Sequence, residues 1–389
     1  MKHRLVALLS LAHLTTDINQ GAVPALLPFL ISAHHLSYTA AAGIVFATNV
    51  ASTIVQPLFG HLADRISKPW LMVAGVVLAG LGLGLTGIAP GYRVLIIVAM
   101  ISGIGVAAFH PEGARAVFGL AGEKQATAMS WFGIGGTMGF AVGPLITTAA
   151  LLHWGLKGTL VLIAPACVVS VILATQLSRF SSPPKSVKSD SADPEPAAQP
   201  DAWGSFARLT VPVIGRSILF YGLNTFIPLY WINVLHQSKA AGGVALTIMA
   251  ASSVIGNLVG GRLSDQLGHK KVILAGFSIL IPLLPVLIWV DQAFLATLLL
   301  VPIGFGMSAT YSPMIVLGQK YLPNHVGLSA GVTIGIAVAI GGVAAPVLGN
   351  IADHHGIWWA LATLAALPVV SILGALTLSH PGSREKHPA

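Results

Sequence analysis

Five ionisable residues have types and spacings that could move a proton. His13 and Asp17 are four residues apart, Glu112 and Arg115 are three apart, and His110 lies just before them. Residues at these spacings share one face of an α-helix, so each pair can interact. A carboxyl group in a low-dielectric site binds a proton more readily, and a nearby arginine opposes this. These five residues are therefore candidates for carrying protons.

Each of these assignments has a structural alternative. We favour Glu112 as the proton carrier, together with Asp17, because ionisable groups inside a membrane are usually functional. Glu112 and Arg115 could instead form a static ion pair, and the two histidines could pack as well as relay protons. The His110-x-Glu112 pair also suggests a zinc enzyme. A zinc site needs three protein ligands at characteristic spacing, however, so we expect no metal site, no cofactor and no enzymatic activity.

A second group of polar residues could contact a small-molecule substrate. Arg216 has a planar guanidinium that binds phosphonate or carboxylate groups in a way that lysine cannot reproduce. An ion pair with Asp17 or Glu112 is an equally good interpretation of Arg216. Six further polar residues could also contact a substrate, although each could instead form a hydrogen bond between helices. These further candidates for substrate contacts are Asn19, Gln20, Gln56, Tyr221, Asn224 and Tyr311.

The elements that position these residues are expected to lie in a membrane. Hydrophobic residues make up 55% of the 389, and charged residues make up only 8%. Soluble proteins carry about a quarter charged residues, and the mean hydropathy here is +0.83. The net charge of +8 is therefore interpreted as an orientation signal, not as a nucleic-acid-binding surface. Cys167 is the one cysteine, so the chain cannot form an internal disulfide.

Twelve apolar segments are long enough to cross a hydrocarbon layer of about 30 Å as helices. They cover residues 5–33, 39–60, 70–90, 93–119, 125–151, 157–178, 205–234, 240–262, 271–290, 293–319, 325–351 and 356–378. Residues 181–202 are rich in Pro, Ser and charge, which predicts a linker. The expected domains are six-helix halves over 1–180 and 203–380, joined by this linker and followed by a tail over 381–389.

Basic residues predict the orientation of the chain. If the N-terminus is cytoplasmic, fifteen Lys and Arg residues lie on the cytoplasmic side and three lie outside, while Arg115 and Arg216 lie within spans. Cytoplasmic loops of membrane proteins carry an excess of Lys and Arg. We therefore expect both termini to be cytoplasmic.

The two halves of the sequence repeat. "GHLADR" at 60–65 matches "GRLSDQ", "AFHPE" at 108–112 matches "TYSPM", and "GFAVGPL" at 139–145 matches "GGVAAPV", each copy lying 201 or 202 residues further on. An even number of helices separates the copies, so both have the same orientation in the membrane. The predicted fold is all-α, with two halves related by a pseudo-twofold axis along the membrane normal.

This pattern resembles the major facilitator superfamily of secondary transporters over the whole chain. The resemblance implies that the first and fourth helices line a central cavity, which would gather the five ionisable residues into one polar cluster of the N-terminal half: His13, Asp17, His110, Glu112 and Arg115. The resemblance implies a gating role for the motif residues Gly60, Asp64 and Arg65 and for their repeat partners Gly261 and Asp265. A glycine ladder that ends in proline resembles the antiporter motif of the family, and it implies a seal between two helices. Plain packing explains those glycines equally well. The ladder consists of Gly135, Gly139, Gly143 and Pro144.

More narrowly, three stretches resemble the fosmidomycin-resistance branch of that superfamily: "HLTTDINQG" at 13–21, "QPLFGHLADRISKPW" at 56–70 and "FHPEGAR" at 109–115. The resemblance implies a monomeric transporter in the bacterial cytoplasmic (inner) membrane that exports fosmidomycin-like or other small antibiotics by alternating access. Its energy source would be the proton gradient, and its partners would be an anionic or drug-like substrate, protons and lipid, without nucleic acid. The alternative is a proton-coupled symporter that imports a small organic anion.

Overall fold

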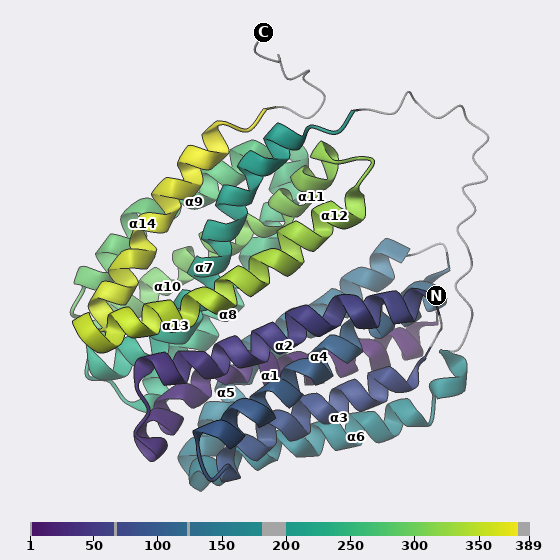
Figure 1. Ribbon diagram of the computed structural model, residues 1–389, viewed down its shortest axis with the longest axis horizontal. Coiled ribbons are helices and arrows are strands. Elements are labelled where there is room, and N and C mark those ends of the chain that lie inside the picture. The colour runs from purple at the N-terminus through teal and green to yellow at the C-terminus, as the bar shows by residue number, and fades with distance from the viewer. Residues whose placement is uncertain (1, 66–67, 123–124, 181–199, 380–389) are drawn as a thin grey trace. The chain divides into compact units, whose positions relative to one another are not determined.

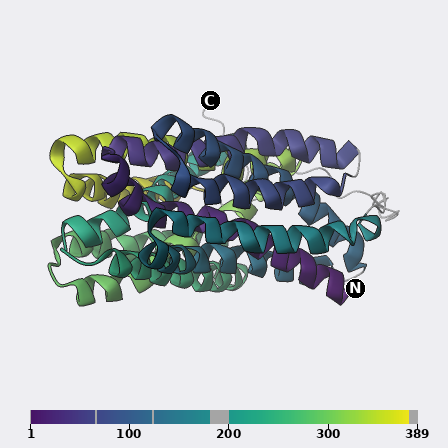
Figure 2. The same cartoon turned by 90° about the horizontal axis from the view of Figure 1, so that it is seen from below.

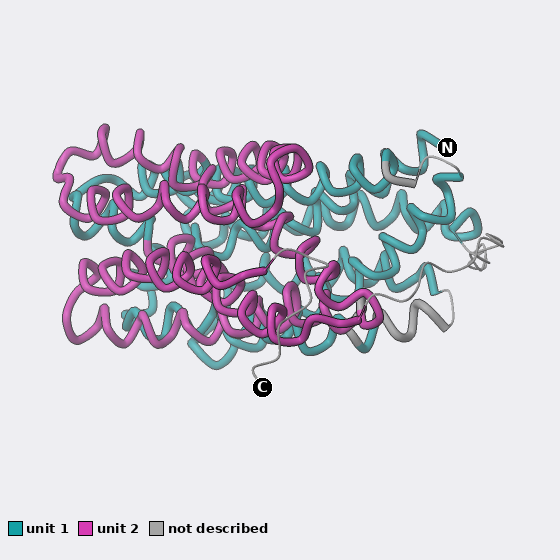
Figure 3. Tube along the Cα trace, turned by 90° about the horizontal axis from the view of Figure 1, so that it is seen from above, with its two compact units in different colours: residues 1–187, 227–247 teal, residues 188–226, 248–389 magenta. Residues whose placement is uncertain are grey.

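The computed structural model describes residues 2–65, 68–122, 125–180 and 200–379, and these ranges are almost entirely helical, with no strand among them (Figure 1). The predicted all-α class is therefore confirmed. The chain divides into two compact units: unit 1 is Met1–Val187 with Ile227–Thr247, and unit 2 is Lys188–Phe226 with Ile248–Ala389 (Figure 3). The predicted limits of the two halves stay predictions, because most of the linker and the tail from 380 onward lie outside the described residues.

Unit 1 contains the helices that carry the five predicted proton-coupling residues. Its helices are α1 (His3–His34), α2 (Tyr38–Arg65), α3 (Trp70–Gly84), η1 (Leu85–Ile88), α4 (Tyr92–Ala121), α5 (Gln125–Trp154), η2 (Gly155–Leu162), α6 (Ile163–Ala174) and η3 (Leu177–Arg179). They run lengthwise beside one another in two views (Figures 1 and 2). Helix α1 packs against α5, and α4 packs against α2 and α3. Helices α1, α4 and α5 also contact one another, so side chains from all three can meet.

The glycine ladder of α5 lies against the main chain of α1. A Cβ atom added to a ladder glycine would meet backbone atoms of α1, at Ser10 for Gly135, Leu14 for Gly139 and Ile18 for Gly143. Small residues allow helices in membranes to approach this closely. Pro144 lies inside α5, directly after the ladder. The close approach predicted from the glycine spacing is present, whereas the sealing role stays a prediction.

Unit 2 contains most of α7 and α8 and all of the later helices. These are α7 (Trp203–Asn233), α8 (Lys239–Leu267), α9 (His269–Trp289), α10 (Ala293–Ala309), α11 (Tyr311–Tyr321), α12 (Val326–Ala330), the π-helical turn η4 (Gly331–Ile336), α13 (Ala337–His355) and α14 (Ile357–Leu376). Helix α9 packs against α10 and α14, and α13 packs against α14.

Two predicted spans of unit 2 are broken. Residues 293–319 form α10 and α11, which meet at Thr310. Pro313 has no N–H to donate to the carbonyl of Ala309 four residues earlier, and this explains why α10 ends there. Residues 325–351 form α12, the π-helical turn and α13. In contrast, α4 continues through Pro111 without a break.

Ten helical stretches of the described chain are long and apolar enough to cross a membrane, two fewer than the twelve predicted. The predicted fifth and sixth spans fall within one stretch, Thr127–Ala174. The predicted first span forms α1 but is not among the ten, because the polar run around Asp17 interrupts its apolar sequence.

The motifs that were expected to form gating loops are helical instead. Helix α2 continues to Arg65, and α8 continues to Leu267, where Gly268 ends it with a φ of +95°. Asp265 is exposed near the end of α8, and Gly261 lies one turn earlier. The side chains of the first copy, Gly60, Asp64 and Arg65, lie outside the described part of the structure.

Exposed tryptophans mark the ends of helices in both units. Six tryptophans are at least half exposed, and five of them lie at or near a helix end: Trp70 at the start of α3, Trp154 at the end of α5, Trp203 at the start of α7, Trp289 at the end of α9 and Trp359 near the start of α14. The sixth, Trp131, lies inside α5. Tryptophan is enriched where membrane proteins cross the boundary between hydrocarbon and water. The positions therefore fit helices that span a bilayer.

Candidate functional site

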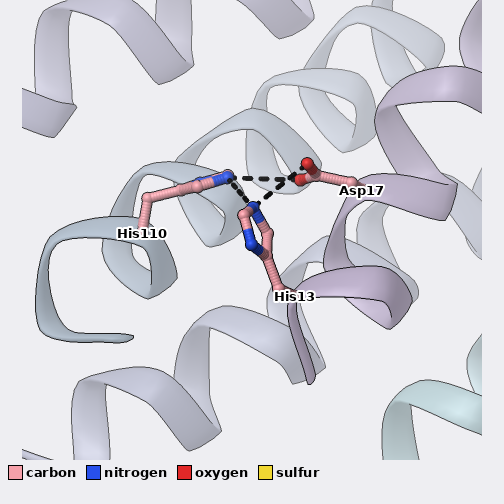
Figure 4. A group of neighbouring side chains, drawn as sticks. All are labelled: His13, Asp17 and His110. Carbon is pink, nitrogen blue, oxygen red and sulfur yellow. Dashed lines mark hydrogen bonds and ion pairs between the residues drawn. The ribbon is translucent and has the colours of Figure 1, made fainter. Parts of the chain in front are cut away.

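Three of the five predicted residues meet in unit 1 (Figure 4). His13 and Asp17 project from α1, and His110 reaches them from α4. The Nε2 atom of His13 lies 3.2 Å from Asp17 Oδ2, and the Nε2 atom of His110 lies 3.3 Å from Asp17 Oδ1. The two Nε2 atoms are 3.1 Å apart. We call these three side chains the histidine–aspartate cluster.

Backbone carbonyls fix how the two imidazole rings of the cluster are protonated. His13 Nδ1 lies 2.8 Å from the carbonyl oxygen of Phe132 on α5, and His110 Nδ1 lies 2.8 Å from that of Val106 on α4. A carbonyl oxygen can only accept a hydrogen bond, so each Nδ1 must carry a hydrogen. Each Nε2 atom of a neutral ring then presents a lone pair to the other ring and to Asp17.

This arrangement can accept a proton. If both rings are neutral, two nitrogen lone pairs face each other at 3.1 Å beside a carboxylate. One added proton turns that contact into a hydrogen bond and places a positive charge next to Asp17. A proton bound there would link α1 to α4.

The surroundings of the cluster are partly apolar and partly open. The ring of Phe132 stacks on that of His13, with 4.2 Å between ring centroids. The side chains of His13 and Asp17 are 11% and 12% exposed, and that of His110 is 22% exposed. The three side chains are therefore mostly buried, and His110 is the most exposed of them.

Gly136 is a residue of this site that sequence reasoning missed. A Cβ atom at this position would collide with the His13 ring and would lie 2.7 Å from Asp17 Oδ2. Helix α5 thus leaves space for the cluster by having no side chain there. Gly136 lies next to Gly135 of the ladder, and a glycine beside the regular four-residue spacing is the signal that could have indicated it.

The expectation of a single five-residue cluster is wrong, because Glu112 and Arg115 form a separate ion pair. The Nη2 atom of Arg115 contacts Glu112 Oε1, and its Nε atom donates to the same oxygen at 3.0 Å. Arg115 also donates to the carbonyl of Phe180 at 3.2 Å. Two residues along a helix correspond to a rotation of about 200°, so Glu112 points away from the face on which His110 reaches Asp17.

Glu112 is the more deeply buried of the two acids. Its side chain is 1% exposed, and its Oε2 atom has no hydrogen-bond partner among the described residues. A charge this deep is stable only when it is paired. Arg115 supplies that pairing from one turn further along α4, as the spacing predicted.

Arg216 lies in a different environment, within unit 2. Its guanidinium carbon is 4.3 Å from the centroid of the Tyr311 ring and 5.5 Å from that of Phe220. Its Nε atom is buried without a hydrogen-bond partner among the described residues. Cation–π contacts therefore hold Arg216, and part of its hydrogen-bonding capacity remains unused.

Arg216 and Tyr311 border a small hollow in unit 2. The remaining lining residues are mostly apolar: Val213, Ser217, Met314, Ile315, Thr333, Ile334, Ala337 and Val338. Thr333 and Ile334 belong to the π-helical turn η4, and such turns are frequent at functional sites. An apolar hollow with one guanidinium suits a small anion with an apolar part.

The other predicted substrate contacts are not gathered into one site. Asn19 donates a hydrogen bond to the carbonyl of Thr15 in its own helix at 2.9 Å. Asn224 likewise donates to the carbonyl of Phe220 at 2.8 Å. Gln56 is exposed, whereas Gln20 and Tyr221 are half-buried. Of these residues, Tyr221 lies near both Arg216 and Tyr311, with which it interacts electrostatically.

The fold and the buried polar groups define a multi-pass membrane transporter. The sequence profile of the Major Facilitator Superfamily matches residues 9–333. The chain belongs to this superfamily of alternating-access secondary transporters.

Individual relatives are similar over nearly their full length. An uncharacterised MFS-type transporter of Bacillus subtilis is 28% identical, covering 98% of this chain and 95% of the relative. The fosmidomycin resistance protein of Escherichia coli is 26% identical, covering 98% and 94%. A bacterial homologue of the human lysosomal transporter Spinster, solved in an inward-facing and occupied conformation, has the same fold with a TM-score of 0.84 at 15% identity, covering 98% and 97%.

Proposed function

We propose that this chain is a drug/proton antiporter that exports fosmidomycin-like or other small antibiotics across the bacterial cytoplasmic membrane, with both termini in the cytoplasm. The observation that carries the proposal is the histidine–aspartate cluster, in which two imidazole lone pairs and a carboxylate converge between two helices. Similarity to the fosmidomycin resistance protein supports the substrate class.

Proton binding at the cluster can be converted into helix movement. With a proton bound, His13, Asp17 and His110 attract one another and draw α1 toward α4. Without it, the facing lone pairs and the carboxylate repel one another, and the same contact is weakened. Alternation between these two states would couple proton release to a change in the helices that carry the residues.

The separate pair of Glu112 and Arg115 has a different part in this proposal. The ion pair of Glu112 with Arg115 suits a structural brace better than a proton carrier. We therefore assign the transported proton to Asp17 and its two histidines. A carrier role for Glu112 stays a prediction that the same transport assay can test.

The test is proton flux in proteoliposomes with a pH-sensitive dye inside. We expect a fosmidomycin gradient to drive protons in the opposite direction, and this flux should be lost in Asp17→Asn. Asp291→Asn is the matched control, because Asp291 is an exposed acid between α9 and α10. Equal fluxes in the wild type and Asp17→Asn would contradict the assignment, and loss in Glu112→Gln alone would transfer the carrier role to Glu112.

Import of a small organic anion by proton symport is the second candidate. A buried guanidinium with an unpartnered Nε atom suits a carboxylate or phosphonate whichever way the substrate moves, so the hollow beside Arg216 is compatible with both candidates. The same assay separates the two candidates. Protons that move in the same direction as an added anion would establish symport and overturn antiport.

A further inference from the structure

We propose that the histidine–aspartate cluster also binds one divalent transition-metal ion such as Zn²⁺. The three contacts within the cluster measure 3.1, 3.2 and 3.3 Å. A tetrahedral ion with bonds of about 2.0 to 2.1 Å holds its ligand atoms about 3.3 Å apart. The 3.2 and 3.3 Å contacts reach different oxygens of Asp17, and one ligand atom from each residue lies within 4.8 Å of the other two. A small rotation of the Asp17 carboxylate would therefore let all three side chains converge on one ion.

The donor set and its supports match those of a metal site. Two imidazole nitrogens and a carboxylate are ligands that suit zinc and similar ions. The remaining nitrogen of each ring is bound to a backbone carbonyl, of Phe132 for His13 and of Val106 for His110. Hydrogen bonds of this kind fix the tautomer and the direction of metal-binding histidines.

The site also has an unused donor and an exposed side. Asp17 Oδ1 is buried without a hydrogen-bond partner among the described residues, although it lies 3.3 Å from His110 Nε2. The His110 side chain is 22% exposed, so an ion can reach the cluster from that side.

Metal and proton would exclude each other at this site. Both need the Nε2 lone pairs of His13 and His110, so Zn²⁺ should inhibit transport wherever this cluster carries the coupling proton. That consequence rests on the proposed function, whereas metal binding does not. A chain that binds the ion but moves no protons would refute only proton coupling.

The experiment is metal titration of the full-length protein, purified in detergent without a polyhistidine tag. Zn²⁺ binding is measured by calorimetry, and Co²⁺ binding is measured by the intense visible absorption of the four-coordinate ion. We expect one ion per chain. Loss of a supporting hydrogen bond lowers metal affinity about 10- to 100-fold, so Asp17→Asn and His110→Ala, which lose a ligand, should lower it more than about 100-fold.

Two further variants keep the test decisive. The double variant His354→Ala and His355→Ala removes exposed histidines at the end of α13, and it should bind Zn²⁺ as the wild type does. Gly136→Ala places a methyl group against His13 and Asp17 without removing a ligand, and it should also weaken binding. Its thermal unfolding shows whether the protein remains folded. Binding that survives all cluster variants, or disappears only in the His354/His355 variant, would overturn the proposal.

Discussion

Asp17 and Glu112 show two ways in which a membrane helix can carry a buried acid. Asp17 lies beside two imidazole rings, those of His13 and His110. Glu112 is paired with the guanidinium of Arg115. Under the proposed function, the first site would change its charge during a transport cycle and the second would keep it.

At this scale we predict a large effect of Arg115→Ala on stability. The change leaves the Glu112 carboxylate, 1% exposed, without its charged partner. Breaking a buried ion pair in this way costs about 3 to 5 kcal/mol, so the unfolding temperature in detergent should fall sharply. The double variant Glu112→Gln and Arg115→Gln leaves no unpaired charge and should be clearly milder. Equal losses in the single and double variants would show that the ion pair is not what stabilises this region.

Helix periodicity predicted part of the candidate site. The four-residue spacing of His13 and Asp17 and the three-residue spacing of Glu112 and Arg115 each correspond to an observed contact. The same periodicity separates Glu112 and Arg115 from the histidine–aspartate cluster, because two residues along a helix correspond to a rotation of about 200°. The expectation of one cluster did not take this rotation between His110 and Glu112 into account. The contribution of Gly136 depends on how α5 faces α1, and that contact is not encoded in the spacing within one helix.

Among the elements, the contact between α1 and α5 gives the sharpest test. Gly139→Ala would push a methyl group into the backbone of α1 at Leu14, and overpacking of this kind costs about 1 to 3 kcal/mol. Gly133→Ala is the matched control on the same helix, because nothing lies within 4 Å of its added Cβ. Alanine favours a helix by up to about 1 kcal/mol over glycine. We expect thermal unfolding to show destabilisation at 139 and neutrality or a gain at 133; the reverse order would refute the close contact.

Helix type was predictable from the apolar runs, but helix continuity was not. The break between α10 and α11 at Thr310 depends on the carbonyl that Pro313 leaves without its helical N–H partner. Pro111, which occupies the equivalent position in the sequence repeat, leaves α4 continuous. The π-helical turn at Gly331–Ile336 has no distinct hydrophobic period. These features depend on tertiary packing, which local sequence describes poorly.

At the scale of the whole molecule, hydrogen bonds attach the segment that leads into α7 to the end of α11 and the residues that follow it. The backbone N–H of Ala202 donates to the carbonyl of Tyr321 at 2.7 Å, and Asp201 accepts hydrogen bonds from the Asn324 N–H at 3.1 Å and from His325 Nδ1 at 2.7 Å. Desolvation raises the pKa of the Asp201 carboxyl, but these hydrogen bonds outweigh it and hold the pKa below its ordinary value of 3.8. The carboxylate form therefore stabilises this attachment.

We predict that this stabilisation depends on pH. A group whose pKa is lower in the folded state stabilises the protein above its unfolded pKa of 3.8, and the effect fades as the pH falls through the folded value. Thermal unfolding should therefore separate the wild type from Asp201→Asn at pH 6. The separation should shrink below about pH 4. A constant difference across this range would show that the charge of Asp201 does not contribute.

The tryptophans at the helix ends limit the kind of motion that transport can use. Trp70 and Trp154 belong to unit 1, and Trp203, Trp289 and Trp359 belong to unit 2. Indole rings favour the interface between hydrocarbon and water, so each unit has anchors that set its own depth in the bilayer. An elevator-like displacement along the membrane normal would pull these rings out of that interface. Tilting of a unit about an axis in the membrane plane would leave them near it, so rocking is the motion that the anchors permit.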